Sequence, residues 1–363
     1  MNRELFPAVQ NSRYFFSAAV GPTPTPVFEA YNEHAKMMHF HGDVNWIAGV
    51  EKLQKTRELI SHHIGAESPL EVAITYNTSH NMNIIADLFK QKGVKKILTC
   101  EEEFPSSTIP FLHRGFTVEF CPAHEIANRI SNQFDAVLVS HIQYGTGYRL
   151  DLKKLGQMAK DSNCLFVVNA TQSFGAFPID VQQCHIDALT ASGHKWLCAG
   201  YGSSILYLRS KFSENTTASL VGWLSPVNFE KMDNKNSQIR NDASKYETGV
   251  PSFATLAGVH AAIQLVEDTG IHRIANRILQ LSHYFVEQLH KKSISISSHR
   301  IDSTSIEDSI NSGTVTLSIR EPDEFVEKLK AEKIYVSQRS GLIRVAIHYF
   351  NNQDDVDCLI ERL

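Results

Sequence analysis

The chain has 363 residues, with 35 Lys and Arg against 39 Asp and Glu, so its formal net charge is −4. Apolar residues make up 42% and charged residues 20%, as in an ordinary globular protein. A nucleic-acid-binding protein usually has an excess of basic residues, so this balance argues against a nucleic-acid partner. No segment approaches the about 20 apolar residues of a membrane-spanning helix. We therefore expect no membrane partner either.

The six cysteines are far apart and form neither a CxxC pair nor a cluster with histidines at metal-binding spacing. Several lie in apolar runs, as Cys164 does before Leu165, which predicts buried free thiols of a reducing compartment. The N-terminal residues lack the apolar core of a signal peptide. These features predict a cytoplasmic protein without a metal site. The six are Cys100, Cys121, Cys164, Cys184, Cys198 and Cys358.

After an irregular, proline-rich start, short apolar runs alternate with helical patterns. Apolar, β-branched runs separated by helices are typical of strands buried on both faces of a mainly parallel sheet. The sequence therefore predicts an α/β fold with a mainly parallel sheet flanked by helices. The expected strands are Glu71–Tyr76, Lys96–Cys100, Phe116–Cys121, Ala136–Ile142, Cys164–Asn169, Ala188–Ser192 and Ser204–Leu208, and the expected helices among them are Thr78–Lys90 and Asp151–Lys160.

The pattern changes near residue 250, where Gly249-Val250-Pro251 interrupts the chain. We therefore predict a large domain over residues 15–250 and a smaller α+β C-terminal domain over residues 251–363, joined by the N-terminal segment 1–14. The elements expected in the smaller domain are helices Ser252–Glu267, His272–Lys291, Asp323–Lys333 and Gln353–Leu363, and strands Ser293–Ser298, Thr314–Ile319, Ile334–Ser337 and Leu342–Ile347.

The strongest local signal is Lys195, which follows a short predicted strand in the turn Ser192-Gly193-His194-Lys195. A lysine held at an apolar strand end is partly desolvated, so its pKa falls and its amine becomes a usable nucleophile. Taken alone, such a lysine is more often a solvated surface residue. Ser192 and His194 favour the first interpretation, because they supply the anion-binding groups that a phosphate-bearing Schiff-base cofactor needs.

Two other segments place polar side chains where predicted strands end. One strand ends in Asn169-Ala170-Thr171-Gln172, and open α/β sheets bind ligands at the carboxyl ends of their strands. Thr78 and Ser79 follow another strand at the start of a helix, where phosphate can bind. The alternatives are a helix-capping Asn with a loop Gln in the first segment, and a simple helix cap in the second.

In this order and at these separations, the three segments resemble the class V aminotransferase and cysteine desulfurase-like family of pyridoxal-phosphate enzymes of fold type I. The resemblance is almost continuous over VVNATQSFGAFPIDVQQCHIDALTASGHKWLCAGYGSSILYL, from Val167 to Leu208. The blocks YETGVPSFATLAGVHAAI and VSQRSGLIRVAIHYFNNQDDVDCLIERL resemble later parts of the family. The resemblance covers nearly the whole chain and is specific for cofactor and fold, but much less so for the reaction.

The resemblance implies roles for the residues at matching positions. Lys195 would form the Schiff base with pyridoxal 5'-phosphate and would then be the general base at Cα. Gln172 would hydrogen-bond the phenolic oxygen of the cofactor. His141 would stack on the pyridine ring and complete the catalytic pair. The residues implied to hold the phosphate are Thr78, Ser79, Ser192 and His194.

Further implied roles concern the substrate and a second subunit. Arg344 would clamp the substrate carboxylate, since a guanidinium binds carboxylates in a bidentate manner. Arg339 is a candidate for a second anion contact, although a solvated arginine is an equal alternative. Thr248 would reach the phosphate of the neighbouring protomer in a homodimer. The candidates for lining the pocket mouth are His39, His41, Asn45 and Trp46.

Two departures from the family bear on the reaction. Asn169 stands where the family has an aspartate that keeps the cofactor ring nitrogen protonated, so the electron sink should be weaker. A shift of two or three pKa units there would be worth about 3–4 kcal/mol. Residues 336–344 contain no cysteine, whereas desulfurases of this family carry a nucleophilic cysteine in this loop. A cysteine desulfurase is therefore disfavoured.

The sequence thus predicts a pyridoxal-phosphate-dependent enzyme that acts at Cα of an amino acid. An aminotransferase, with a 2-oxo acid as possible second substrate, is the preferred prediction. The alternatives are a lyase or epimerase that uses the same Lys195, and a protein that binds the cofactor with little turnover because of Asn169.

Overall fold

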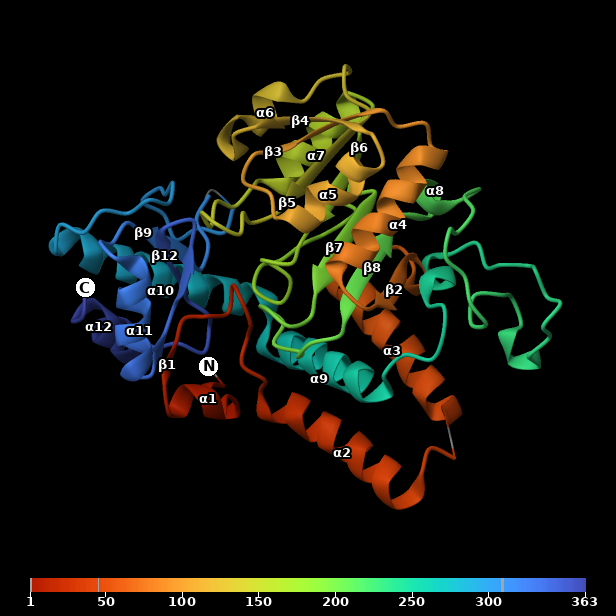
Figure 1. Ribbon diagram of the computed structural model, residues 1–363, viewed down its shortest axis with the longest axis horizontal. Coiled ribbons are helices and arrows are strands. Elements are labelled where there is room, and N and C mark those ends of the chain that lie inside the picture. The colour runs from red at the N-terminus through yellow and green to blue at the C-terminus, as the bar shows by residue number, and fades with distance from the viewer. Residues whose placement is uncertain (1, 45, 308–309) are drawn as a thin grey trace.

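The computed structural model describes residues 2–44, 46–307 and 310–363 of the chain. A seven-stranded sheet forms the centre of the molecule, with helices on both faces (Figure 1). All neighbouring strands run parallel except that β8 is antiparallel to both of its neighbours. This confirms the predicted mainly parallel sheet. In spatial order the strands are β2 (Val72–Thr75), β8 (Ser204–Leu208), β7 (Ala188–Ser192), β6 (Leu165–Asn169), β5 (Ala136–Ser140), β3 (Lys96–Cys100) and β4 (Thr117–Cys121).

The two faces of the sheet are covered by different helices. Helices α4 (Thr78–Gln91) and α5 (Pro105–His113) contribute Phe89 and Phe111 to the core on one face. Helix α7 (Leu152–Asp161) contributes Leu155 to the core on the other face. Every residue of β5, β7 and β8 is buried, because strands covered on both sides have no solvated face.

Capping residues set the starts of two helices that position loops of the site. The Asn77 side chain accepts a hydrogen bond from the His80 amide at 2.8 Å and begins α4. The Asp151 carboxylate accepts one from the Lys154 amide at 3.0 Å and begins α7. These side chains satisfy amides that lack partners inside the helix.

The prediction of an irregular proline-rich start is wrong beyond residue 24. Pro26 lies in the first turn of helix α2 (Thr25–His41), a position where the missing amide hydrogen of proline costs nothing. Helix α3 (Trp46–Ile64) follows it. Only Val27 of α2 is buried, so this helix has almost no apolar stripe for a pattern to reveal.

The C-terminal part contains a three-stranded antiparallel sheet, in which β12 (Leu342–Ala346) lies between β11 (Ser337–Arg339) and β9 (Thr314–Leu317). Strand β1 (Arg13–Tyr14), near the N-terminus, pairs in parallel with β10. The strand predicted over Ser293–Ser298 is wrong, since only Ile296 bridges to the sheet, at Leu317. The remaining bounds are α9 (Phe253–Thr269), α10 (Ile271–Lys291), β9 (Thr314–Leu317), α11 (Pro322–Ala331), β10 (Ile334–Tyr335), β11 (Ser337–Arg339), β12 (Leu342–Ala346), α12 (Gln353–Ile360), and the short helices α1 (Pro7–Gln10), α6 (Ile126–Arg129) and α8 (Ser210–Ser213).

Helix α10 contributes side chains to two hydrophobic cores. Ile274 and Ile278 pack with the core of the large sheet, whereas Phe285 and Leu289 pack with the C-terminal sheet. Helix α9 packs against α2 and α3 and belongs to the first core. The domain boundary near residue 250, with the joining segment 1–14, stays a prediction.

All six cysteines are free thiols. Within residues 2–44, 46–307 and 310–363, no helix is both long and apolar enough to cross a membrane. The same part of the chain gathers no three His, Cys, Asp or Glu side chains that could hold a metal ion.

Candidate active site

A cavity of about 530 Å³ opens beyond the carboxyl ends of β5, β6 and β7, where open α/β sheets bind ligands. Its lining brings together residues from segments more than two hundred positions apart in the chain. Among the described residues that line it there is neither Asp nor Glu. The lining residues are Phe16, Ala18, Ala19, Val20, Asn77, Thr78, Ser79, Phe104, Ser106, Ser140, Tyr144, Asn169, Thr171, Gln172, Ser192, His194, Lys195, Arg339 and Arg344.

Lys195 lies in the turn after β7, and its Nζ is 5.4 Å from the centre of the Phe104 ring. Burial lowers the pKa of Lys195 to about 7, and the positive charges of Arg344 and Arg339 act in the same direction. Desolvation and like charges both disfavour the ammonium form. The lysine amine is therefore available as a nucleophile near neutral pH.

Hydroxyl groups from three strand ends meet on one side of the cavity. The Thr78 hydroxyl lies 2.7 Å from the Ser192 hydroxyl and 3.0 Å from the Thr171 hydroxyl. Thr78 and Ser79 also open helix α4, whose first amides have no partner inside the helix. His194 stacks on Tyr201 at 5.0 Å, and burial together with Lys195 lowers the pKa of His194 to about 4. This side of the cavity can hold an anion such as a phosphate.

Two amide side chains are held firmly beside Lys195. Gln172 donates to the Ala18 carbonyl at 3.0 Å and accepts from the Trp196 indole at 2.8 Å. Asn169 donates to the Ser107 hydroxyl at 2.9 Å, and its oxygen accepts from the Thr171 amide at 3.0 Å.

Two arginines reach the cavity from the antiparallel hairpin of β11 and β12. Arg344 is buried and donates to the Tyr144 carbonyl at 2.7 Å and to the Ser337 hydroxyl at 3.0 Å. Burial and the neighbouring Arg339 lower the pKa of Arg344 to about 10. Within the described residues Arg344 forms no ion pair, so a buried cation faces a cavity without acids. Such a group can bind a carboxylate.

The structure does not bring every predicted site residue into this cavity. His141 follows Ser140 but does not line the cavity; burial and the charge of Arg149 lower its pKa to about 3. The His141 Nδ1 atom is buried and has no hydrogen-bond partner in the described part of the chain. Thr248 lies away from the cavity, where its carbonyl accepts from the Leu224 amide at 3.4 Å.

The candidates for the pocket mouth that the structure describes, His39, His41 and Trp46, do not line this cavity. Trp46 packs edge-on against Trp223, with ring centres 5.9 Å apart. His39 and His41 lie in the last turn of α2, on the outside of the molecule. Asn45 lies outside the described residues. Their predicted roles at the mouth, like those of His141 and Thr248, stay predictions.

The segment after β3 was not predicted to belong to the site, yet it supplies Phe104 and Ser106 to the cavity and Ser107 to Asn169. The Phe104 ring lies 5.2 Å from that of Tyr144. The same carboxyl-end rule that selected Asn169 would have found Phe104, because it follows the predicted strand Lys96–Cys100.

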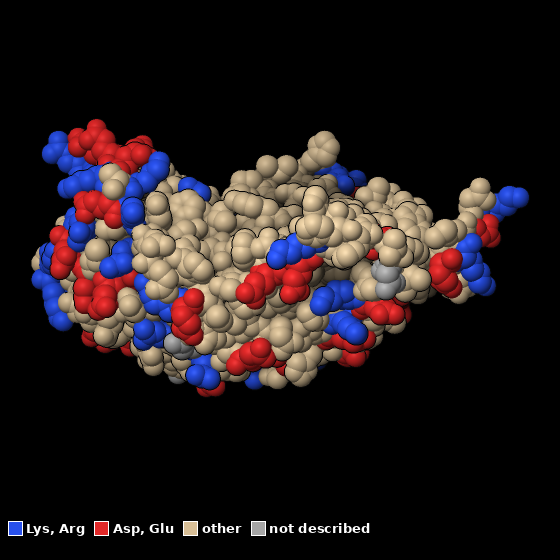
Figure 2. Space-filling model, turned by 90° about the horizontal axis from the view of Figure 1, so that it is seen from below, with Lys and Arg blue, Asp and Glu red and all other residues tan. Residues whose placement is uncertain are grey.

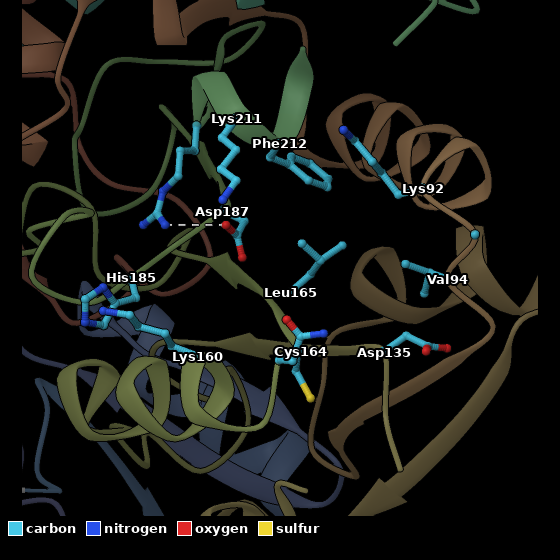
Figure 3. A pocket seen from close by; sticks show the side chains of 13 residues that line it. Lys92, Val94, Asp135, Lys160, Cys164, Leu165, His185, Asp187, Lys211 and Phe212 are labelled. Carbon is cyan, nitrogen blue, oxygen red and sulfur yellow. Dashed lines mark ion pairs between the residues drawn. The ribbon is translucent and has the colours of Figure 1, made fainter. Parts of the chain in front are cut away.

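A second cavity, of about 550 Å³, lies at the opposite ends of the strands, near the amino ends of β6 and β7 (Figure 3). Its two acids already have partners. Asp187 lies 3.6 Å from Arg209 and accepts from the Phe166 amide, and Asp135 accepts from the amides of Lys95 and Lys96. The lysine whose pKa is lowered to about 7 and the buried Arg344 both lie at the carboxyl ends of the strands, which makes the cavity around Lys195 the candidate active site.

Comparison with known proteins gives a consistent picture. A model of the family described as "Aminotransferase class-V" matches residues 13–359. An uncharacterized aminotransferase, YcbU, of Bacillus subtilis is 24% identical over 371 residues, which cover 99% of this chain and 96% of that protein. A probable cysteine desulfurase of Pyrococcus abyssi is 26% identical over 393 residues, which cover 99% of this chain and 95% of that protein.

Solved structures share the fold. The apo structure of a cysteine desulfurase from Thermococcus onnurineus has a TM-score of 0.88 at 23% identity, covering 99% of this chain and 95% of that one. A complex of the cystine C-S lyase C-DES with its product cysteine persulfide has a TM-score of 0.85 at 22% identity, covering 98% of each chain. Because these relatives carry different reaction names, the comparison leaves the reaction open.

Proposed function

Since the chain belongs to the class V aminotransferase family of pyridoxal-phosphate-dependent transferases, we propose that the cavity around Lys195 binds pyridoxal 5'-phosphate and acts on an amino acid. The family, fold and cofactor predicted from the sequence are thereby confirmed. The observation that carries the assignment of this cavity is the Lys195 amine, whose pKa is lowered to about 7 in a cavity lined by two arginines and no acid among the described residues.

The residues around the cavity fit this cofactor. Thr78, Ser79, Ser192 and His194 form the side that can hold its phosphate, and the cavity volume of about 530 Å³ suits a small cofactor with an amino acid. Phe104 offers a flat aromatic face beside the Lys195 amine. Phe104, which lines the cavity, is a second candidate for stacking on the ring beside His141, which does not line it.

Bound pyridoxal phosphate supplies an electron sink for the bond that breaks at Cα of the substrate. Arg344 binds the substrate carboxylate and so sets the orientation of the bonds at Cα. The Lys195 amine, once free, accepts or returns the proton at Cα. Arg339 lies at the same cavity and is the candidate for a second anionic group on the substrate.

We favour an aminotransferase, with a 2-oxo acid as the second substrate. A lyase or an epimerase that uses the same Lys195 is the second candidate. A protein that binds the cofactor with little turnover is the third, because the neutral Asn169 lines the cavity and would weaken the electron sink. A cysteine desulfurase is disfavoured, because the hairpin of β11 and β12 carries no cysteine. Cys198, near Lys195, is buried and its thiol pKa is raised by burial, so it is a poor nucleophile. The six free thiols favour a reducing, cytoplasmic setting.

A homodimer with shared sites is part of the proposal. On the face seen in Figure 2, charged side chains lie at the two ends of the molecule and across its lower middle, and the upper middle shows few. Exposed apolar side chains favour a covered surface. They include Phe28, Phe40, Ile47, Tyr201 and Trp223. In this proposal Thr248, which does not line the cavity of its own chain, contacts the site of the second subunit.

The decisive experiment is borohydride reduction of the cofactor-loaded protein, followed by peptide mass spectrometry. The expected result is one phosphopyridoxyl adduct on Lys195, absent in Lys195→Ala. The matched control is Lys245, a buried lysine with a lowered pKa that lies outside the cavity and should carry no adduct. A reduced protein without an adduct on Lys195 would rule out the proposal.

A panel of amino acids then separates the candidate reactions. An aminotransferase converts the cofactor to its pyridoxamine form and releases a 2-oxo acid. A lyase or an epimerase returns the original absorption band while its product accumulates. A protein with little turnover changes neither the band nor the amino acid.

A further inference from the structure

Gln172 lines the same cavity as Lys195, and two neighbours determine how its side-chain amide is turned. The Trp196 indole donates to the Gln172 oxygen at 2.8 Å, and the Gln172 nitrogen donates to the Ala18 carbonyl at 3.0 Å. An indole N–H can only donate and a carbonyl can only accept. The opposite orientation of the amide would bring two donors together and two acceptors together, so these contacts allow only one orientation.

This orientation leaves one hydrogen-bond donor of Gln172 for a ligand. The side-chain nitrogen carries two hydrogens, and the Ala18 carbonyl accepts one of them. The second has no acceptor in the described part of the chain. Gln172 is only 5% exposed, and a buried donor costs free energy unless a ligand or a water molecule accepts its hydrogen. The cavity therefore holds an N–H group whose orientation is fixed before any ligand binds.

Trp196 is itself held by a residue from the C-terminal part of the chain. Its buried indole stacks on the His348 ring, with ring centres 5.2 Å apart and planes 22° apart. The His348 Nδ1 atom accepts from the Tyr349 amide at 2.9 Å, so Nε2 carries the ring hydrogen and donates it to the Trp196 carbonyl at 3.0 Å. His348 follows strand β12, which carries Arg344.

We propose that Trp196 is a positioning residue that fixes Gln172 as a hydrogen-bond donor to the ligand of the cavity, and that His348 holds Trp196 in place. The inference rests on the proposed function, which makes this ligand pyridoxal phosphate, and deepens it. A donor that is already oriented loses little freedom on binding, and it therefore raises the affinity for the ligand. The same pair of rings joins the turn that carries Lys195 to the strand that carries Arg344.

The first test uses the cofactor-free protein and observes the hydrogen bond itself. The Trp196 indole hydrogen should exchange slowly with deuterium, and Gln172→Leu, which removes its acceptor, should speed this exchange about tenfold. NMR of ¹⁵N-labelled protein measures the exchange, and the signal is identified by its absence in Trp196→Phe. The matched control is Gln182→Leu, since Gln182 donates to the buried Tyr207 hydroxyl outside the cavity, at 3.4 Å. It should leave the exchange unchanged. Equal exchange in the parent and in Gln172→Leu would overturn the proposal.

The second test measures whether Trp196 acts through Gln172. Gln172→Leu should weaken cofactor binding about two- to tenfold, as the loss of one hydrogen bond does. Trp196→Phe keeps an aromatic ring and removes the indole N–H; it should also weaken binding, and the double variant should bind no more weakly than Gln172→Leu. The control is Tyr207→Phe, which removes a hydroxyl from a buried ring of β8 and should leave the affinity unchanged. Unaltered binding in Trp196→Phe, or losses that multiply in the double variant, would refute the role of Trp196.

Two variants of His348 keep the test decisive if Trp196→Phe does not fold. His348→Gln retains an N–H that can donate to the Trp196 carbonyl, and His348→Leu does not. His348→Leu should weaken cofactor binding in the parent but not in the Gln172→Leu background, and His348→Gln should restore most of the loss. Equal losses in both backgrounds would contradict the proposal. A parent that binds no cofactor would instead refute the proposed function, while the exchange of the indole hydrogen would still decide whether Trp196 fixes Gln172.

Discussion

At the scale of single residues, the chemistry of the site depends on the desolvation of Lys195 beside two arginines. Lys195 meets no acid among the described residues of the cavity, and burial is the largest cause of its lowered pKa, followed by Arg344 and Arg339. In water a lysine amine is almost wholly protonated at neutral pH, with a pKa of about 10.4. Here burial lowers that pKa to about 7, so a far larger share of the amines is free at neutral pH.

This predicts how the cofactor-free protein condenses with pyridoxal phosphate. The condensation rate should rise with pH through a midpoint near 7, because only the unprotonated amine attacks the aldehyde. Arg339→Ala should move the midpoint to higher pH, since removing a positive charge favours the ammonium form. Stopped-flow absorbance at a series of pH values measures both effects.

The control is Arg320→Ala, which removes an arginine that is 93% exposed and does not line the cavity. It should leave the midpoint unchanged. A parent midpoint near 10, or a downward shift in Arg339→Ala, would contradict the assigned environment of Lys195.

At the scale of elements, the strand ends are positioned by close packing of helices on the sheet. Helix α7 crosses the sheet with Gly156 against the chain near Cys184, and a Cβ atom on Gly156 would lie 1.7 Å from the Cys184 carbonyl oxygen. Interiors as dense as this cannot absorb an added methyl group without moving backbone. The close approach explains why a glycine occupies a helix interior, where it is otherwise unfavourable.

Gly156→Ala should therefore reduce the free energy of unfolding by about 1–3 kcal/mol or more. Gly145→Ala is the matched control, because its added Cβ meets no atom within 4 Å, and we expect a change within about 0.5 kcal/mol. Denaturant unfolding followed by circular dichroism measures both. Equal stabilities of the two variants would show that α7 can shift away from residue 184.

At the scale of the whole molecule, the two ends of the chain close the C-terminal unit. Arg3 forms a bidentate pair with the buried Asp355 at 2.7 and 3.0 Å, and Arg13 lies 3.3 Å from the same carboxylate. Strand β1 joins β10, and α10 passes through both cores. The hairpin that carries Arg344 is thereby held against the large sheet that carries Lys195.

The proposed dimer predicts complementation between two defective chains. Lys195→Ala should be inactive, and Thr248→Ala should bind the cofactor phosphate more weakly. In mixed dimers one site combines the intact Lys195 of one chain with the intact Thr248 of the other. About a quarter of all sites should regain full cofactor affinity if the two chains mix at random.

Cofactor titration of the mixture, against each variant alone, measures this recovery. A mixture of Lys195→Ala with the double variant Lys195→Ala/Thr248→Ala is the control and should recover nothing. If the first mixture also recovers nothing, the sites are not shared through Thr248.

Local sequence patterns were sufficient to predict the strands of the large sheet and the site residues that follow them. Apolar, β-branched runs predict strands whatever their neighbours in the sheet are, and helical periodicity predicts helices. The seven strands of the large sheet and helices α4 and α7 therefore follow from the pattern alone. The carboxyl-end rule then selects Lys195, Asn169 and Thr78 before any contact is known. Helix α2 could not be predicted in this way, because a helix that buries only Val27 carries almost no apolar period.

By itself, then, the sequence determined the family, the cofactor, the parallel sheet and the reactive lysine, because each rests on short patterns or on a nearly continuous resemblance. Only the tertiary structure decided which side chains meet. Phe104 reaches the cavity where His141 does not, and Ser107, which follows a different strand, accepts a hydrogen bond from Asn169. The physical reason is that β3 lies beside β5 and β5 beside β6 in the sheet, and strand order, which sets contacts between distant segments, leaves no local pattern in the chain.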